Sequence, residues 1–290
     1  MNESDQQRLA AGEALLPSLA DITPDKADAR VRDTYESIQA TLRVPFNNYF
    51  FRSLANWPDY FDNAWRALAP GVGTYAFERI ADELRVAAVP DSLPAIDIDW
   101  STLGPLEDIR SFTDSIHYVL PKLVLIATCL DLGLVPVPRD SAPLPHAVAP
   151  DTQALAMVSE QEAPANVKAI FEDIKVTHSH PGVASYYRGI AHWPEFLSTV
   201  WQRVKVRVGS EDYQARKEEV LSLARQAVEQ RLDAQPLETV TGLAQPDEVG
   251  SIAAVFRYRF TIDLLLDVGL IQGMLGGRQA AMRSRFSVHH

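Results

Sequence analysis

Cysteine is nearly absent from this sequence of 290 residues, and positive charge is in deficit. Its one cysteine, Cys129, excludes a disulfide framework within the chain and any metal site built from several cysteines. Lys and Arg total 27 against 38 Asp and Glu, and the resulting net charge of −11 argues against nucleic acid as a partner. No long apolar stretch follows the polar N-terminus, so we expect a cytoplasmic protein.

The familiar catalytic and phosphate-binding motifs are missing too. There is no G-x-G-x-x-G, no Walker phosphate loop, no H-E-x-x-H and no G-x-S-x-G, which leaves little support for phosphate chemistry or for hydrolysis by a catalytic triad. Residues 118–137 are nearly all apolar, but they include Pro121, Lys122 and Asp131. We therefore expect this stretch to form a buried central helix, and we expect no membrane partner.

An internal repeat is the main positive signal. Residues 19–84 align without a gap on residues 155–220, at a constant shift of 136. The Trp57-Pro58 pair, for example, matches Trp193-Pro194. Matching blocks at one spacing indicate two copies of a supersecondary unit. A functional site is therefore expected between two halves that are similar but not identical.

The periodicity along the chain is helical. In each copy a helix ends before a proline, Pro45 or Pro181, a second helix follows, and a third begins at the Trp-Pro pair, after Asn56 or a capping His192. Further helices are predicted over residues 75–88, 109–132, 213–232 and 246–270, with no convincing strand. The sequence thus predicts an all-α fold of two pseudo-symmetric tandem repeats packed around a central pocket.

The predicted organisation has five parts. Prolines crowd the stretch between the copies, which indicates an extended connection. We expect an N-terminal tail (1–18), helical repeat 1 (19–135), a Pro-rich linker (136–154), helical repeat 2 (155–275) and a C-terminal tail (276–290).

Several motifs resemble the group I 2-haloacid dehalogenases, the DehI type. In the first copy these are Asp33-Thr34-Tyr35-Glu36, Thr41-Leu42-Arg43-Val44-Pro45, Leu54-Ala55, Pro58, Tyr60 and Ala64-Trp65-Arg66. In the second copy they are His178-x-His180-x-Gly182-x-Ala184-Ser185 and Ala191-x-Trp193-Pro194, with Pro121-Lys122 between the copies. The resemblance implies a dimeric, cofactor-free enzyme with a pocket for a small 2-halocarboxylate between its repeats. It also implies that an aspartate activates water while an asparagine holds it.

Both catalytic positions of the family are substituted in this chain. The resemblance aligns the aspartate with Tyr186 and the asparagine with Leu120. An ordinary phenol is protonated at neutral pH, and leucine offers no hydrogen bond. The sequence therefore predicts that standard hydrolytic dehalogenation is lost and that hydrolysis of another kind, elimination or isomerisation replaces it.

The remaining candidates surround the same predicted pocket. We consider Tyr186, His117 and Tyr49 as catalytic residues, because each can donate or accept a proton. Tyr186 could equally fill the space of a lost site, and His117 could be a satisfied core histidine. The expected substrate pocket comprises Phe46, Ser185, Leu120, Tyr118 and Arg52.

Two further pairs of residues admit more than one role. Arg52 and Arg188 occupy equivalent positions, which favours a structural ion pair, with Glu36 or Glu172, over a clamp on a substrate carboxylate. His178 and His180 are expected to form hydrogen bonds to their loop rather than to ligate a metal, and no metal or cofactor is predicted. The protein is either an enzyme acting on a small or medium organic acid, or a ligand-binding or dimeric scaffold without turnover.

Overall fold

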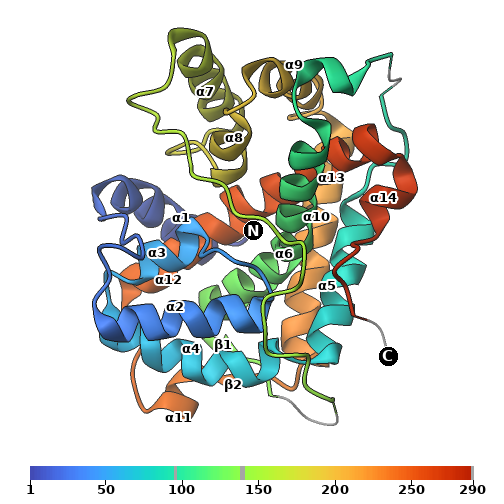
Figure 1. Cartoon of the computed structure of the whole chain (residues 1–290). Coiled ribbons are helices and arrows are strands. Elements are labelled where there is room, and N and C mark those ends of the chain that lie inside the picture. Colours follow the sequence, from blue (N-terminus) through green and yellow to red (C-terminus); the bar gives the residue numbers. More distant parts are fainter. Residues whose placement is uncertain (95–96, 138–140, 289–290) are drawn as a thin grey trace.

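The fold of the chain is almost entirely helical (Figure 1), as a computed structural model describes it for residues 1–94, 97–137 and 141–288. The first half contains α1 (Glu3–Leu15), α2 (Ala29–Leu42), α3 (Tyr49–Leu54), α4 (Pro58–Val72), α5 (Tyr75–Ala88) and α6 (Leu106–Asp131). The second half contains α7 (Ala165–His178), α8 (Ser185–Ile190), α9 (Pro194–Lys205), α10 (Glu211–Gln226), α11 (Leu237–Thr241), α12 (Asp247–Val255), α13 (Thr261–Gly276) and α14 (Arg278–Met282). The prediction of an all-α protein is confirmed.

Short irregular elements interrupt these helices. The 3₁₀ turns are η1 (Leu16–Ser18) and η2 (Trp100–Leu103), and the π-helical turns are η3 (Ala227–Arg231) and η4 (Phe256–Phe260). Two strands of two residues, β1 (Leu134–Val135) and β2 (Gln235–Pro236), pair antiparallel. The helix predicted over 246–270 is thus divided into α12, η4 and α13.

The two copies of the sequence repeat fold alike. Helices α2 and α3 begin and end 136 residues before α7 and α8 do, and α4 begins 136 residues before α9. After α2 and α7, Arg43 and Ser179 both take the left-handed conformation, with φ of 66° and 55°. A residue in this conformation ends a helix and turns the chain, and Pro45 and Pro181 then prevent its continuation.

Side-chain contacts are repeated as well. Trp65 Nε1 donates to Ser37 Oγ at 3.0 Å, and its counterpart Trp201 donates to Asp173 Oδ2 at 2.8 Å. His192 does not cap α9 as predicted, because its Nε2 lies 2.8 Å from the carbonyl oxygen of Ala156. The equivalent Asn56 amide donates to Ala20 at the same distance. In both copies this side chain fixes the segment that precedes the repeat's first helix.

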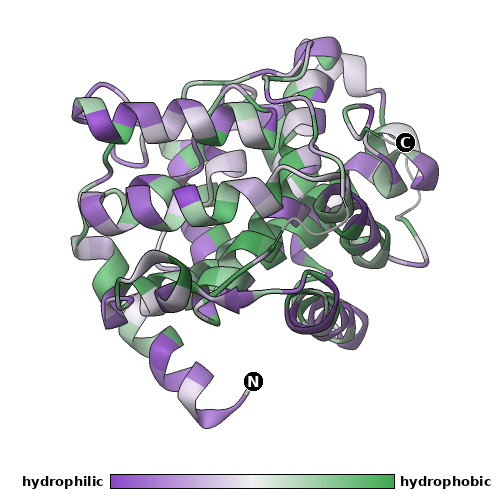
Figure 2. Ribbon diagram, turned by 90° about the horizontal axis from the view of Figure 1, so that it is seen from below, coloured by the Kyte–Doolittle hydropathy of each residue, from purple (hydrophilic) through white to green (hydrophobic). Residues whose placement is uncertain are grey.

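Helices α6 and α13 form the centre of the molecule. They pack against each other (Figure 1) and are largely buried, and apolar residues concentrate in the interior of the molecule (Figure 2). The stretch 118–131 is buried, and Cys129 lies within it with a pKa raised by burial to about 12. Among the helices of the described residues, none has the length and hydrophobicity needed to cross a bilayer.

Both ends of the chain are packed more closely than the sequence suggested. Most of the predicted N-terminal tail forms α1, which packs along α12. The predicted C-terminal tail includes α14 and then places Phe286 against Tyr118, with ring centroids 5.7 Å apart. Pro138 of the predicted linker and the last two residues of the tail lie outside the described residues.

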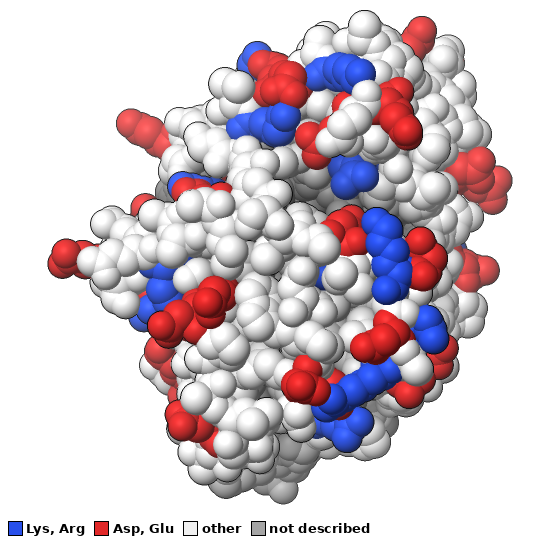
Figure 3. All heavy atoms as spheres, turned by 90° about the vertical axis from the view of Figure 1, so that its left-hand side faces the viewer, with Lys and Arg blue, Asp and Glu red and all other residues white. Residues whose placement is uncertain are grey.

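The surface carries charges of both signs. On the face shown in Figure 3, the described Lys and Arg side chains lie among Asp and Glu side chains. This mixture does not resemble the continuous basic stripe that phosphate backbones require.

One prediction concerns the crossing of α1 and α12. A Cβ added to Gly12 would overlap the carbonyl oxygen of Ser251 and lie 2.6 Å from Val255 Cγ2. Gly12→Ala should therefore lower the free energy of unfolding by about 1–3 kcal/mol, although alanine favours helix formation. Urea unfolding measures this change. In the control, Ala11→Gly at an exposed site of α1 should cost only about 1 kcal/mol, and a stabilised Gly12→Ala variant would show that α1 does not pack this closely.

Candidate functional site

A cleft lies where the two repeats meet. Asn48 and Tyr49 line it from the first repeat, and their counterparts Ala184 and Ser185, shifted by 136, line it from the second. The rest of its wall comprises Leu120, Phe256, Phe260, Thr261 and Leu264. Equivalent residues of the two repeats therefore meet at this cleft. Its free volume is about 10 Å³, which is about the space of one water molecule.

Two short helices begin at this cleft. Tyr49 is the first residue of α3, and Asn48 Oδ1 caps that helix by accepting from the Phe50 N–H at 2.9 Å. Ser185 is the first residue of α8, where Ala184 provides no side-chain cap. The loops after Pro45 and Pro181 therefore place unlike side chains at equivalent positions of the two repeats.

Tyr186 is buried but does not line the cleft. Its ring stacks on Phe112 with centroids 5.9 Å apart, and its hydroxyl lies 3.2 Å from Thr113 Oγ1 on α6. Burial raises the pKa of Tyr186 far above its ordinary value. The phenol is therefore a protonated group packed behind the cleft, and it does not share the cleft with Leu120.

His117 and Tyr118 face a different part of the molecule from Leu120. Burial lowers the pKa of His117 well below its ordinary value, and the nearby charge of Arg85 acts in the same direction. Tyr118 accepts from Lys122 Nζ at 2.7 Å, and that amine lies 2.6 Å from Glu78 on α5. Neither Tyr118, whose hydroxyl meets Lys122, nor His117 is among the residues that line the inter-repeat cleft.

The other predicted residues lie at or near the cleft. Tyr49, Ser185 and Leu120 line it, whereas Phe46 packs against the core beside it. Arg52 belongs to an ion pair, as its repetition in both copies favoured, but its partner is Asp21 rather than Glu36 or Glu172. The Nε–Oδ1 distance is 2.6 Å.

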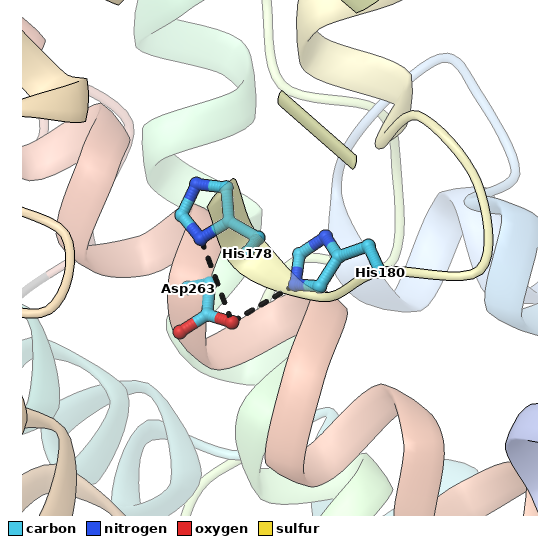
Figure 4. A group of neighbouring side chains, drawn as sticks. All are labelled: His178, His180 and Asp263. Atoms are coloured by element: carbon cyan, nitrogen blue, oxygen red, sulfur yellow. Dashed lines mark hydrogen bonds and ion pairs between the residues drawn. The ribbon is translucent and has the colours of Figure 1, made fainter. Parts of the chain in front are cut away.

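A buried polar cluster lies next to the cleft wall (Figure 4). His178 Nδ1 and His180 Nε2 both point to Asp263 Oδ2 on α13, at 3.8 and 2.9 Å. The two imidazole rings are stacked, with centroids 4.8 Å apart, and the His180 ring lies 4.7 Å from that of Phe260. Since Phe260 lines the cleft, this cluster supports its wall from behind.

Further groups complete the cluster. Lys217 Nζ on α10 lies 2.6 Å from Asp263 Oδ1. Asp267 accepts from the hydroxyls of Tyr187 and Tyr213 at 2.7 and 3.0 Å, and its Oδ2 lies 3.0 Å from His178 Nε2. The cluster thus joins α8, α10 and the end of α7 to α13.

The pKa values of the two histidines are shifted in opposite directions. Burial lowers the pKa of His178, but the carboxylates of Asp267 and Asp263 outweigh it and raise the pKa above 6.5. Burial lowers the pKa of His180 below that value, and the neighbouring His178 and Lys217 add to the effect. Asp263 is held ionised, since Lys217 and the histidines outweigh its burial and lower its pKa. Lys217 lies against Asp263, and the raised pKa of His178 favours the protonated imidazole between the two carboxylates.

These side chains could also be considered as metal ligands. One atom each from His178, His180 and Asp263 lies within 4.8 Å of the others, and two imidazoles with a carboxylate are donors that suit zinc. A divalent ion would have to displace the proton of His178 and lie near the ammonium group of Lys217, which already neutralises Asp263. The charge balance therefore favours a protonated hydrogen-bonded network over a metal centre.

Sequence reasoning found the histidines but missed their partners. Both histidines were expected to bond to their own loop, whereas they contact Asp263 and Asp267 on α13. The repeat itself carried one signal, because Leu42 and Val44 occupy the equivalent positions in the first copy and are buried. Two apolar core residues replaced by histidines indicate a buried polar site in the second repeat.

The shifts predict how the two histidines titrate. In NMR spectra of protein labelled at histidine, His178 should titrate above pH 6.5 and His180 below it. The raised pKa of His178 means that its stabilising contribution is complete below its unfolded pKa and is lost as the pH rises through the folded value. Single His→Gln variants assign the signals, and exposed His146 serves as the control. Titration of both residues on the same side of 6.5 would contradict this charge arrangement.

Comparisons with known proteins agree with this architecture. A configuration-inverting 2-haloacid dehalogenase of Alcaligenes xylosoxydans xylosoxydans is 28% identical over 296 residues, which cover 95% of this chain and 99% of that protein. An (R)-2-haloacid dehalogenase of Pseudomonas putida is 26% identical over 279 residues, covering 87% and 86%. No protein-family model matches the chain.

Solved structures share the fold. A D-2-haloacid dehalogenase mutant superposes with a TM-score of 0.75 at 23% identity, covering 91% of this chain and 96% of that one. A complex of D-2-haloacid dehalogenase with L-LA gives a TM-score of 0.73 at the same identity and coverage. The chain is thus similar over nearly its whole length to several curated 2-haloacid dehalogenases and shares the all-α fold of the solved ones, which supports the resemblance to the group I, DehI-type family.

Proposed function

We propose that this chain is a dehalogenase-like enzyme that acts on a small organic acid in the inter-repeat cleft, by a reaction other than standard hydrolytic dehalogenation. The observation that carries the proposal is the lining of the cleft. Equivalent positions of both repeats meet there, yet no carboxylate or imidazole belongs to the described residues that line it. The relatives named above act on 2-haloacids, which are small carboxylic acids.

The polar groups of the cleft support such a change. Tyr49 and Ser185 contribute hydroxyls from opposite repeats. The Thr261 hydroxyl already donates a hydrogen bond to the Phe256 carbonyl oxygen at 2.7 Å. Burial raises the pKa of Tyr49, so its phenol can donate a proton or a hydrogen bond but is a poor base at neutral pH. No carboxylate that could activate water belongs to the described residues that line the cleft.

One observation favours the alternative, a ligand-binding or dimeric scaffold protein without turnover. The free space of about 10 Å³ in the cleft admits a water molecule but not an organic acid. An enzyme must therefore open this cleft by moving side chains such as Tyr49, which is only partly buried. Proton NMR of the protein incubated with 2-halo, 2-hydroxy and unsaturated C3 and C4 acids separates the candidates. A new product signal supports the enzyme, and unchanged acids after long incubation support the scaffold.

Halide release is the direct test of the altered chemistry. The purified protein should release little or no chloride from either enantiomer of 2-chloropropionate, because the cleft lining lacks a base for water. A chloride-specific electrode or ion chromatography measures the product. A dehalogenase of the family, assayed in parallel, serves as the positive control. Rapid chloride release by this chain would mean that another carboxylate activates water and would overturn the proposal.

Restoring the family's residues should restore halide release. The double variant Tyr186→Asp with Leu120→Asn reintroduces a carboxylate and an amide at the positions that the resemblance assigns to catalysis. We expect chloride release from at least one enantiomer, because removing the Tyr186 ring, which packs on Phe112 behind the cleft, opens space for water beside the new carboxylate, which can then accept a proton from it. The matched control is Tyr186→Asn with Leu120→Asn, which opens the same space without the charge. Equal rates in the two double variants would contradict a role for the carboxylate.

A further inference from the structure

We propose that Arg188 is the residue that binds the carboxylate of the substrate, and that its counterpart Arg52 does not take part. The inference deepens the proposed function and rests on it, because it assigns the recognition of an organic acid to one side of the cleft. It follows from a difference between two arginines that the repeat makes equivalent.

The two arginines occupy the same place in the fold. Arg52 is the fourth residue of α3 and Arg188 the fourth residue of α8. Each therefore lies one helical turn after the residue that lines the cleft, Tyr49 or Ser185, and on the same face of its helix. The guanidinium carbon of Arg52 lies 5.7 Å from the centroid of the Tyr49 ring. The charges of both Arg52 and Arg188 reach Tyr49, where they partly offset the effect of burial on its pKa.

Their partners differ because one position of the repeat has changed. Arg52 Nε lies 2.6 Å from Asp21 Oδ1, and Arg52 Nη1 donates to the Asn47 carbonyl oxygen at 2.7 Å. The residue equivalent to Asp21 in the second copy is Met157. Arg188 Nε instead donates to the neutral carbonyl oxygen of Val158 at 3.0 Å. Within the described residues, no carboxylate lies at ion-pair distance from Arg188.

This difference gives Arg188 the properties of an anion receptor. Its backbone carbonyl accepts from the Val158 N–H at 3.1 Å, and its Nε is held by the same residue, so the side chain is anchored. Its two terminal nitrogens keep their donors, which suit the paired oxygens of a carboxylate. The guanidinium is partly buried, where water screens its charge less than at an open surface. Arg52 has the same shape, but Asp21 already satisfies its charge.

The resulting assignment orients the substrate. The carboxylate faces the second repeat at Arg188, and the remainder of the acid faces the aromatic wall formed by Tyr49 and Phe256, whose ring centroids are 5.7 Å apart. Because Arg52 is paired with Asp21 while Arg188 has no carboxylate partner, the cleft admits an acid in one direction only. The ligand class is accordingly a small monocarboxylate with an apolar or halogenated C2 or C3.

The test measures binding rather than turnover. Isothermal titration with propionate and with each enantiomer of 2-chloropropionate should show binding to the natural protein, whereas uncharged propionamide should bind far more weakly. Arg188→Gln should weaken propionate binding by about tenfold or more, because a charge-assisted pair is lost. Arg188→Lys should recover part of the affinity. Thermal unfolding of each variant confirms that it is folded.

A charge placed at Met157 gives the sharpest comparison. Met157→Asp supplies Arg188 with the partner that Arg52 already has, and it should weaken propionate binding to a similar extent as Arg188→Gln. Met157→Asn, which matches it in size but lacks charge, should bind propionate as the natural protein does. Undiminished binding in both Arg188→Gln and Met157→Asp, or a larger loss in Arg52→Gln, overturns this inference and leaves the proposed function standing. Failure of every acid to bind the natural protein overturns both.

Discussion

Two buried carboxylates on α13, Asp263 and Asp267, hold the second repeat in place. They contact side chains from α7, the loop after it, α8 and α10. These are His178, His180, Tyr187, Tyr213 and Lys217. Removal of one partner from such a network leaves a charge without compensation, at a cost of about 3–5 kcal/mol. Thr261 and Leu264, which lie on either side of Asp263 in α13, line the inter-repeat cleft. The position of α8 relative to the cleft wall therefore depends on this cluster.

The same backbone unit is stabilised differently in the two halves. The first repeat buries Leu42 and Val44 where the second buries His178 and His180. Apolar packing of this kind tolerates different apolar side chains around it, whereas a hydrogen-bonded network of charges fixes the positions of its partners. The second repeat is thus the more precisely positioned partner at the cleft, and it also carries the arginine without a carboxylate.

The sequence predicted local structure well because local signals determine it. Apolar periodicity and the prolines predicted that α2 and α7 end before Pro45 and Pro181 and that α3 and α8 follow them, and the shift of 136 implied equivalent positions before any contact was known. Contacts between distant segments were harder to predict. No local pattern indicates that Tyr118 turns toward α5, or that the phenol of Tyr186 lies against Phe112. Adjacent residues on a buried helix point in different directions, and long-range packing decides which of them meets the cleft.

The π-helical turn η4 illustrates a second limit. The apolar pattern over residues 246–270 is continuous, so it indicates one helix, yet the chain inserts a wider turn at Phe256–Phe260 between α12 and α13. That turn presents Phe256 and Phe260 to the cleft. Such turns occur often at functional sites, and they arise from tertiary packing rather than from composition.

The burial of Cys129 has a practical consequence. Its thiol is fully enclosed in the central helix and stays protonated at neutral pH, so it resists alkylation and oxidation while the protein is folded. Because the chain has no other cysteine, a thiol introduced on the surface becomes the one reactive group of the native molecule. Spectroscopic labels can then be attached on either side of the cleft without first removing the native cysteine, and exposure of Cys129 to a thiol reagent reports loss of the native core.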